Sequence, residues 1–187
     1  MLSENQKFDK ADFTKTILPI GEYENCTFIN CNFYNLNLND YIFRECLFDS
    51  CDLSLVSVKN TMFNDVKFIK SKLLGIRFDE CKLFLLSFEF NNCLLKLSVF
   101  YKLKLKKIVF TNTNMQECDF TETDLSGAIF DNCDLLNATF DRTNLEKADF
   151  RTAFNYSLDP ENNRIKKARF STASLHGLLQ KYDIVID

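Results

Sequence analysis

A five-residue pattern decides the fold of this chain, and it is clearest in residues 128–150, AIFDNCDLLNATFDRTNLEKADF. A Phe or Leu returns at every fifth position of this stretch, and Ala, Cys or Thr stands two positions before each one. An α-helix buries residues three and four apart, and a half-buried strand alternates with a period of two. A sustained period of five therefore excludes both as the unit of the fold and indicates an internal repeat.

The same frame extends toward the N-terminus. It runs through residues 8–88 without interruption, slips by two residues within 89–95, and resumes from Leu95 to Phe150. An unbroken frame before the slip predicts no projecting loop in residues 8–88. The positions expected to point inward in that first part are Phe8, Phe13, Leu18, Tyr23, Phe28, Phe33, Leu38, Phe43, Phe48, Leu53, Val58, Phe63, Phe68, Leu73, Phe78, Leu83 and Phe88.

Composition limits the class of protein. With 187 residues, 20 Phe and no Trp, the chain can bury a core as one domain or two. Only 4 Gly and 2 Pro argue against a fold made of many tight hairpins. No charged start followed by an apolar run stands at the N-terminus, and no apolar stretch approaches the ~20 residues of a membrane span. We expect a cytoplasmic protein with no membrane partner.

Several triplets of the repeat have a small residue, then Asp or Asn, then Leu or Phe. In this they resemble the motif of the pentapeptide-repeat family. The matching triplets begin at Ala11, Cys31, Cys51, Cys118, Thr123, Cys133 and Ala148. The resemblance implies an all-β fold, a right-handed quadrilateral β-helix with four five-residue sides per coil. On such a coil, Phe100, Phe120 and Phe140 share one side. Leu105, Leu125 and Leu145 share another, and Phe110, Phe130 and Phe150 lie opposite the first.

The eight cysteines all stand two positions before an expected inward residue. The spacing of Cys26, Cys31, Cys46 and Cys51 imitates two pairs of zinc ligands. The slot they occupy is, however, the small inward position of the family motif. Free Cys packs as a small apolar residue, so we expect packing rather than metal binding, and a reducing compartment.

Catalytic residue combinations are nearly absent. His176 is the only histidine, which leaves no Ser-His or Cys-His pair within the repeats. Four glycines allow no phosphate-binding loop. We therefore expect neither an enzyme nor a cofactor.

Charge changes sign along the chain. The net charge is −5 in residues 1–58, +7 in 59–110, −7 in 111–150 and +2 in 151–187. Four cations, one on each side of a single expected coil, form what we call the basic girdle: Lys67, Lys72, Arg77 and Lys82. A second basic cluster follows the slip: Lys102, Lys104, Lys106 and Lys107. The acidic band, expected to point to water throughout, contains Glu117, Asp119, Glu122, Asp124, Asp131, Asp134, Asp141, Glu146 and Asp149.

Three interpretations of these bands remain open. The repeat motif itself favours Asp before the inward residue, so the bands could merely keep the rod soluble. Alternatively, outward carboxylates on a rod of duplex-like width could imitate DNA phosphates and occupy a basic protein surface. The third interpretation, that the girdle contacts nucleic acid, is the weakest, because the girdle lacks exposed aromatic residues. We expect no direct nucleic-acid partner.

The last part of the chain is expected to differ from the repeats, and we therefore divide the chain into a β-helix of residues 1–150 and a C-terminal unit of residues 151–187. A turn at residues 159–163 precedes a short helix capped by Ser171 or Thr172. Leu175, Leu178, Leu179 and Tyr182 form its apolar face. A short strand with Ile184 and Ile186 follows. These residues are the candidates for capping the coil or for joining two chains.

This ending also resembles that of the Qnr quinolone-resistance proteins and of the microcin immunity protein within the same family. In those relatives it joins two rods end to end, and the dimer engages DNA gyrase or topoisomerase IV as a DNA mimic. The resemblance implies a homodimer and a type II topoisomerase partner bound through the acidic band. Qnr proteins usually carry projecting loops needed to protect gyrase, and the frame predicts none here. The alternative function is a protein-interaction scaffold with no effect on topoisomerases.

Overall fold

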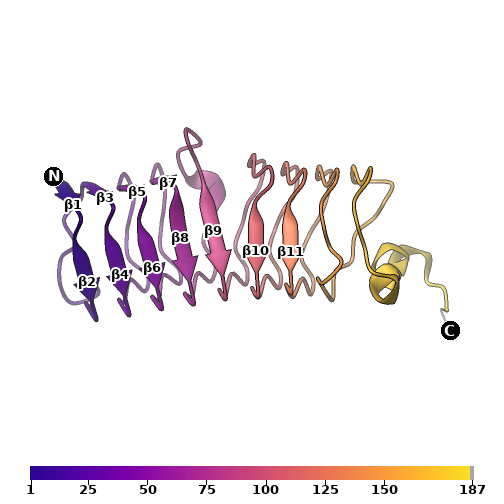
Figure 1. Ribbon diagram of the computed structural model, residues 1–187, viewed down its shortest axis with the longest axis horizontal. Coiled ribbons are helices and arrows are strands. Elements are labelled where there is room, and N and C mark those ends of the chain that lie inside the picture. The colour runs from indigo at the N-terminus through magenta and orange to yellow at the C-terminus, as the bar shows by residue number, and fades with distance from the viewer. Residues whose placement is uncertain (186–187) are drawn as a thin grey trace.

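The chain forms a rod of stacked coils with a helical segment at its C-terminal end (Figure 1). The computed structural model describes residues 1–185. One parallel sheet follows the order β1 (Leu2–Glu4), β3 (Glu22–Glu24), β5 (Ile42–Arg44), β7 (Met62–Asn64). A second contains β2 (Lys7–Asp9), β4 (Thr27–Ile29), β6 (Leu47–Asp49), β8 (Val66–Ile69), β9 (Phe88–Asn91), β10 (Val109–Thr111) and β11 (Ile129–Asp131).

All coils but one take twenty residues, as the family resemblance implies. Tyr23 pairs with Phe43, and Phe110 pairs with Phe130, in parallel registers twenty residues apart. The remaining two sides are joined by single parallel bridges such as Asp119 to Thr139. The expected quadrilateral β-helix is confirmed. Bulky side chains can fill the interior of this β-helix because each coil places them at the same inward positions.

Phenylalanine stacks fill the core. Phe120 stacks on Phe100 and on Phe140, with ring centroids 5.1 and 5.2 Å apart. Phe110 stacks on Phe130 at 5.4 Å and meets Phe120 edge to face at 6.4 Å. All of these rings are buried. The predicted opposite phenylalanine sides are thus confirmed, and their edge-to-face contacts add to the burial of apolar surface.

The coil turns at residues with a positive φ, which recur two positions after most inward residues. Many are Asn, a residue that tolerates this left-handed conformation, and two are Gly75 and Gly127. Leu55 and Leu97 also adopt it, at φ 61° and 65°. The regular left-handed corner explains how the chain makes tight bends with so few glycines.

The small inward slot, two positions before each inward residue, does more than save space. The thiol of Cys118 and the hydroxyl of Thr123 donate to the carbonyls of Leu95 and Phe100, at 3.1 and 2.7 Å. Each acceptor lies 23 residues earlier, in the preceding coil. Similar bonds recur for Cys46, Ser71, Ser98, Cys133 and Thr143. The packing interpretation of cysteine was therefore incomplete, since these side chains also link successive coils.

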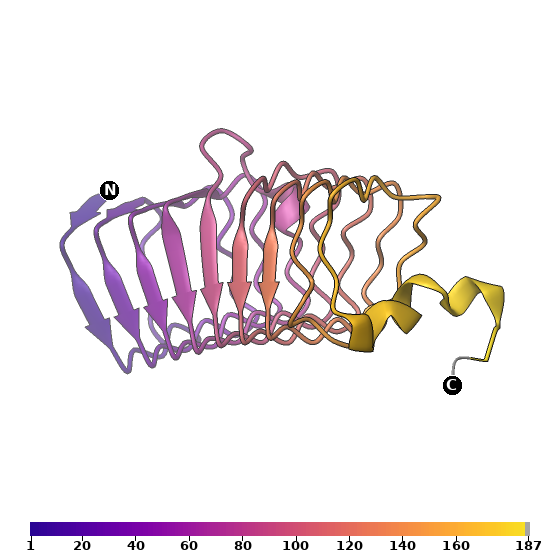
Figure 2. The ribbon, with the colours of Figure 1, turned by 45° about the vertical axis from the view of Figure 1, so that its right-hand side comes forward.

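The interruption of the frame is wrongly placed by the sequence. The pairing offset is already 22 residues between Val66 and Phe88 and returns to 20 between Phe90 and Phe110. The two extra residues therefore lie before Phe88, in a segment that we call the projecting loop, residues 82–87 (Figure 2). Leu83 is exposed instead of inward, and Phe90 takes the inward position that we predicted for Phe88. The prediction of no loop before Phe88 was also wrong, because apolar residues inside the loop happened to keep the period of five.

Paired backbone continues past Phe150, where we expected the fives to stop. Asp149 bridges Arg169, and Asn144 bridges Arg164, so Ile165 and Phe170 follow the inward positions of Leu145 and Phe150. Phe170 stacks on Phe150 at 5.3 Å. The division of the chain at residue 150 stays a prediction, but coil stacking crosses it.

The C-terminal segment covers the end of the coil with short helices. The expected turn at residues 159–163 is present, with the Asn162 amide donating to the Asp159 carbonyl at 3.3 Å. The expected single helix is instead two 3₁₀ helices, η2 (Thr172–Leu178) and η3 (Gln180–Tyr182). Ser171 makes no capping bond with its hydroxyl. Ile184 and Val185 are not in a strand, and Ile186 lies outside the described residues.

Gly177 allows η2 to pack closely against the last coil. It is buried, its carbonyl accepts the amide of Leu158, and a Cβ there would meet the carbonyl oxygen of Tyr156 at 2.2 Å. Only glycine permits that approach. The segment therefore caps the last coils against further edge pairing.

Candidate protein-binding surface

The acidic band is less accessible than its sequence suggests. Glu117 and Asp131 are exposed, whereas the other seven predicted residues are only partly exposed. Asp149 retains 16% of its side-chain exposure. The positions before and after an inward residue lie on the flat sides of the rod, where neighbouring coils shield them. None of the nine is buried, so they point outward as expected, but neighbouring coils restrict the exposure of seven of them.

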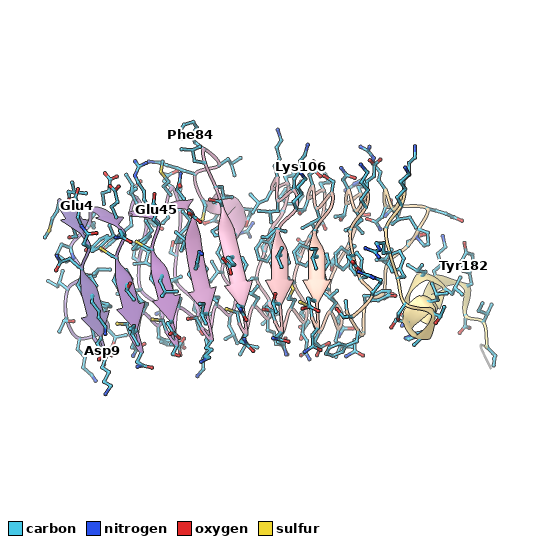
Figure 3. The ribbon with its side chains drawn as sticks, viewed as in Figure 1. Glu4, Asp9, Glu45, Phe84, Lys106 and Tyr182 are labelled. Atoms are coloured by element: carbon cyan, nitrogen blue, oxygen red, sulfur yellow. The ribbon has the colours of Figure 1, made fainter. Side chains whose placement is uncertain are left out.

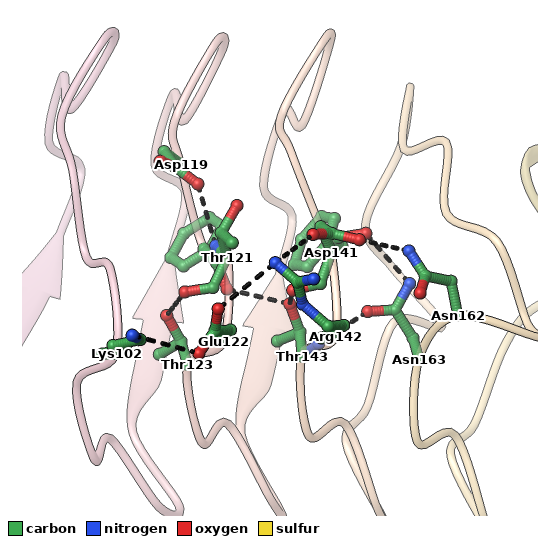
Figure 4. A network of polar contacts seen from close by, with 12 residues as sticks. Lys102, Asp119, Thr121, Glu122, Thr123, Asp141, Arg142, Thr143, Asn162 and Asn163 are labelled. Carbon is green, nitrogen blue, oxygen red and sulfur yellow. Dashed lines mark hydrogen bonds and ion pairs between the residues drawn. The ribbon is translucent and has the colours of Figure 1, made fainter.

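Six of the nine carboxylates form ion pairs, largely with cations one coil away. Glu117 pairs with Lys96 at 3.0 Å, and Glu146 pairs with Arg164 at 2.7 Å. Glu122 lies between Lys102 and Arg142, at 3.4 and 3.2 Å (Figure 4). The remaining pairs join Asp124 to Lys106, Asp141 to Arg142, and Asp149 to both Arg151 and Arg169. Cations from the basic cluster and the C-terminal unit thus neutralise much of the band.

Hydrogen bonds hold the other three acidic side chains. Asp134 accepts from the amide groups of Gln116 and Asn155, at 2.7 and 2.9 Å. Asp131 accepts the Thr152 hydroxyl at 2.9 Å, and Asp119 accepts the Thr121 amide at 2.8 Å. Most of the band is therefore engaged within the rod rather than free to receive a partner.

The pKa values of the paired carboxyls agree with this engagement. The hydrogen bond from Arg151 lowers the pKa of Asp149 below its ordinary value, and Arg169 adds to the effect. The hydrogen bond from Arg164 lowers the pKa of Glu146 in the same way. An opposite charge at short range favours the ionised form. These groups remain charged at neutral pH, but each has its countercharge beside it.

The basic girdle is likewise largely paired. Lys67 meets Glu89 at 3.4 Å and Lys72 meets Asp52 at 4.0 Å. Arg77 pairs with Asp79 and Glu80, at 2.7 and 3.1 Å. Within residues 1–185, Lys82 forms no ion pair. The girdle therefore does not present four free cations to a nucleic acid.

The N-terminal coils hold acidic residues that lie outside the predicted band. Glu4 and Glu24 lie directly opposite each other on β1 and β3, and Glu45 follows at the same corner of the rod. Together with Asn5 and Asn25 they line a shallow groove at that corner. In the described part of the chain these three carboxylates form no ion pair. The twenty-residue spacing of Glu4 and Glu24, and that of Asn25 and Glu45, was visible in the sequence once the coil length was known.

The projecting loop is the largest irregularity on the rod, and its side chains are apolar. Leu83, Phe84 and Leu85 are 64%, 70% and 53% exposed. Phe84 lies at the outer end of the loop, on the same side of the rod as Lys106 (Figure 3). Adjacent exposed apolar side chains on a charged rod indicate a protein contact. The sequence signal for it was the two-residue slip, which we placed too late.

The residues predicted for dimerisation are divided between packing and exposure. Leu178 and Leu179 are half-buried, whereas Leu175, Tyr182 and Ile184 are exposed. Tyr182 donates its hydroxyl to Glu161 at 3.0 Å, and Lys181 pairs with Asp159 and Glu161 at 2.7 and 2.8 Å. The segment is thus tied back to the turn of its own chain. Its role in dimerisation stays a prediction, and Ile186 cannot be placed because it lies outside the described residues.

The cysteines are buried and free. Burial raises the pKa of Cys46, Cys51, Cys118 and Cys133 to about 12, and that of Cys93 to about 11. Thiols so protonated are poor nucleophiles and poor metal ligands at neutral pH. In residues 1–185 no group of His, Cys, Asp and Glu side chains is arranged to hold a metal ion.

None of the helices in the described part of the chain is long and apolar enough to cross a bilayer.

Two family profiles match the sequence. The profile "Pentapeptide repeat region" matches residues 22–89, and "Pentapeptide repeats (8 copies)" matches residues 118–154. Comparison with curated protein sequences finds no match.

Solved structures share the fold over the whole chain. Full-length QnrB1, a plasmid-mediated fluoroquinolone resistance protein, aligns with a TM-score of 0.64 and 15% identity, covering 98% of this chain and 100% of QnrB1. A trypsin-treated variant of QnrB1 gives 0.66 and 19%, covering 100% and 92%. HetL, a pentapeptide repeat protein involved in heterocyst differentiation regulation from the cyanobacterium Nostoc sp. strain PCC 7120, gives 0.56 and 14%, covering 91% and 84%.

Proposed function

Because the chain belongs to the pentapeptide-repeat family, we propose that it is a non-enzymatic, protein-binding rod whose partner is a type II topoisomerase, DNA gyrase or topoisomerase IV. The projecting loop is the observation that carries this proposal. It places Leu83, Phe84 and Leu85 away from the coils, where a partner can bury them. Buried aromatic and aliphatic anchors contribute most of the energy of such contacts.

Two further features support a topoisomerase as the partner. The chain shares its fold from end to end with QnrB1, a fluoroquinolone resistance protein. The sequence predicted no projecting loop, which was the main expected difference from the Qnr proteins. The loop in the structure removes this difference. In this proposal the acidic band and the free carboxylates Glu4, Glu24 and Glu45 face basic surface of the enzyme, and two rods join through their C-terminal segments.

The alternative is a scaffold for a different protein. The ion pairs across the acidic band favour it, because a DNA mimic gains from carboxylates without countercharges. HetL, a protein involved in the regulation of differentiation, shares the fold as well. In this alternative the loop still makes the contact, but the enzyme does not respond.

A gyrase supercoiling assay with and without a quinolone distinguishes the two functions. We expect the purified chain at micromolar concentration to inhibit supercoiling or to protect it from the drug. Replacing Leu83, Phe84 and Leu85 with Ser is expected to weaken the effect by roughly tenfold or more, since apolar anchors are lost. The control is Leu136→Ser, which alters an exposed leucine on a regular coil.

No effect of the unmodified chain on gyrase or topoisomerase IV would leave the scaffold alternative. An equal effect of the loop variant would remove the loop from the contact. Light scattering of the same sample tests the proposed dimer, and a monomer at micromolar concentration would contradict it.

A further inference from the structure

The coil that carries the projecting loop leaves one sheet of the rod unfinished. The sheet of β1, β3, β5 and β7 ends at Asn64. On the same side of the rod, the Lys82 and Ser87 amides at the ends of the loop still donate to the carbonyls of Thr61 and Phe63, but the next β-bridge is the one from Lys104 to Asp124. The two extra residues cause this interruption, because they carry the chain outward where the next rung of the sheet would lie (Figure 2).

The interruption leaves backbone groups of residues 103–107 without partners. One coil later, the Asp124 amide donates to the Leu103 carbonyl, while the carbonyls of Asp124 and Ser126 accept from Leu105 and Lys107. The equivalent groups facing the interrupted coil are the Lys104 amide and the carbonyls of Lys104 and Lys106. Within residues 1–185 none of these three groups has a hydrogen-bond partner in the chain. They form an open strand edge with one donor and two acceptors.

A groove of about 210 Å³ lies along this edge, which we call the Lys104 edge. Leu86, Phe88 and Ile108 supply its apolar lining, and Phe88 is held in place by rings of Phe63 and Phe78 at 5.6 and 5.1 Å. A larger groove of about 390 Å³ adjoins it and shares Ser87, Phe88, Lys107 and Ile108. The floor of the smaller groove is therefore formed by side chains that pack against the core.

The charged side chains that line the smaller groove at the Lys104 edge are all cationic, whereas the adjoining larger groove also contains Asp65 and Glu89. Lys104, Lys106 and Lys107 are exposed and line the smaller groove, in which no carboxylate takes part. Lys106 pairs with Asp124 at 3.4 Å, whereas Lys104 and Lys107 form no ion pair within the described residues. Lysines at an open edge discourage pairing between two copies of the chain, since like charges would meet. They favour an acidic segment instead.

We propose that the Lys104 edge binds an extended acidic segment of a partner protein as an added β-strand. The segment's backbone pairs with the Lys104 amide and with the carbonyls of Lys104 and Lys106. Side chains of a strand alternate between its faces, so apolar residues lie on Leu86 and Phe88 while the intervening carboxylates meet the lysines. Main-chain bonds give such a complex affinity, and the pockets and charges give it specificity. This site is independent of whether the partner is a topoisomerase.

A defined peptide tests the proposal by fluorescence anisotropy. The probe is a fluorescein-labelled peptide of alternating Glu and Val with blocked ends, and its matched control alternates Lys and Val. We expect micromolar binding of the acidic peptide that weakens with added salt, and no binding of the basic one. Methylating alternate backbone nitrogens of the acidic peptide keeps its charge but removes its donors, so we expect roughly tenfold or more weaker binding.

Substitutions at one position separate the backbone from the charge. Lys104→Pro removes both the lysine charge and the edge amide, whereas Lys104→Ala removes only the charge. Because that amide faces the interrupted coil, proline there breaks no bond within the rod. We expect Lys104→Pro to bind about tenfold more weakly than Lys104→Ala, the effect of about one backbone hydrogen bond.

Three results of direct peptide binding would overturn the proposal. They are no binding of the acidic peptide at millimolar concentration, equal binding of the methylated peptide by the unmodified chain, and equal binding of the basic peptide. Displacement of the acidic peptide by oligothymidylate at comparable concentration would also overturn it, because the site would then recognise anionic polymers in general. The methylated peptide tests the backbone bonds even where Lys104→Pro fails to fold.

Discussion

The coils from Phe90 to Phe150 and the single coil before them obey the same sequence pattern but have different surfaces. In the first region each rung pairs with its neighbours at an offset of twenty residues, and the charged residues largely neutralise one another. In the second, two additional residues change the offset to 22, expel Leu83 and leave an open strand edge. In a regular coil, the backbone and charged groups pair with those of neighbouring coils. In the irregular coil, some of these groups stay unpaired and are accessible to a partner.

The comparison also separates two kinds of charged residue. On the regular coils, a carboxylate at one position meets a cation that comes from the coil before or after it. At the interruption, Lys104 and Lys107 form no ion pair within the described residues, because Asp124, which stands in register with Lys104 one coil later, pairs with Lys106 instead. In both proposals, binding therefore depends on where regularity fails, more than on the net charge of a stretch.

The largest contrast is expected in the contribution of phenylalanine to stability. Phe110 is fully buried between the rings of Phe90 and Phe130, whereas Phe84 is 70% exposed in the loop. We expect Phe110→Ala to lower the free energy of unfolding by about 3–5 kcal/mol. Phe84→Ala should change it by less than about 0.5 kcal/mol. Denaturant unfolding followed by circular dichroism measures both, and comparable losses would refute the distinction between core and loop.

The second prediction removes the irregularity itself. Deleting Phe84 and Leu85 places Leu83 five residues before Phe90, which restores the uniform frame. We expect Leu83 to turn inward, raising the free energy of unfolding by about 1–2 kcal/mol through burial of its side chain. The same variant should lose binding of the acidic peptide, because a completed rung occupies the Lys104 edge. A destabilised variant, or one that still binds the peptide, would contradict this account of the loop.

The smallest expected effect concerns the inward slot. Thr123→Val removes the hydroxyl that donates to the Phe100 carbonyl at 2.7 Å while keeping the shape of the side chain. We expect a loss of about 1 kcal/mol, because the Phe100 carbonyl loses the hydroxyl donor and keeps only the Leu103 amide. Thr139→Val is the control, since Thr139 is exposed on a neighbouring side of the rod. Equal effects of the two substitutions would show that the bond between coils contributes nothing.

Much of the fold could be predicted from the sequence because the repeat is local. The period of five identified the inward residues, and the four-sided coil implied by the family resemblance placed Phe100, Phe120 and Phe140 in one stack, which the structure confirms. The position of the interruption could not be found in this way. Leu83 and Phe88 fit the period of five only because they are apolar. Apolar character does not distinguish a core residue from an exposed loop residue.

The candidate surface was predicted less well, for a different reason. Asp149 and Arg169, like Glu122 and Arg142, are twenty residues apart. Counting charges along the chain places Arg169 in a separate band and treats Asp149 as free. The coil brings them together on adjacent rungs. The C-terminal leucines were also assigned to one helix by their spacing, whereas packing of Gly177 against Tyr156 accompanies two 3₁₀ helices.

The sequence by itself determined which side chains of the regular coils point into the rod, because that feature depends only on spacing along the chain, and the family resemblance supplied the length of the coil. The tertiary structure alone decided which charges remain unpaired, where the frame breaks and which backbone groups stay open. Those features depend on what the coil above or below supplies, twenty residues away. Residues 128–150 are regular enough to reveal the fold, and for that reason most of their carboxylates already have partners within the rod.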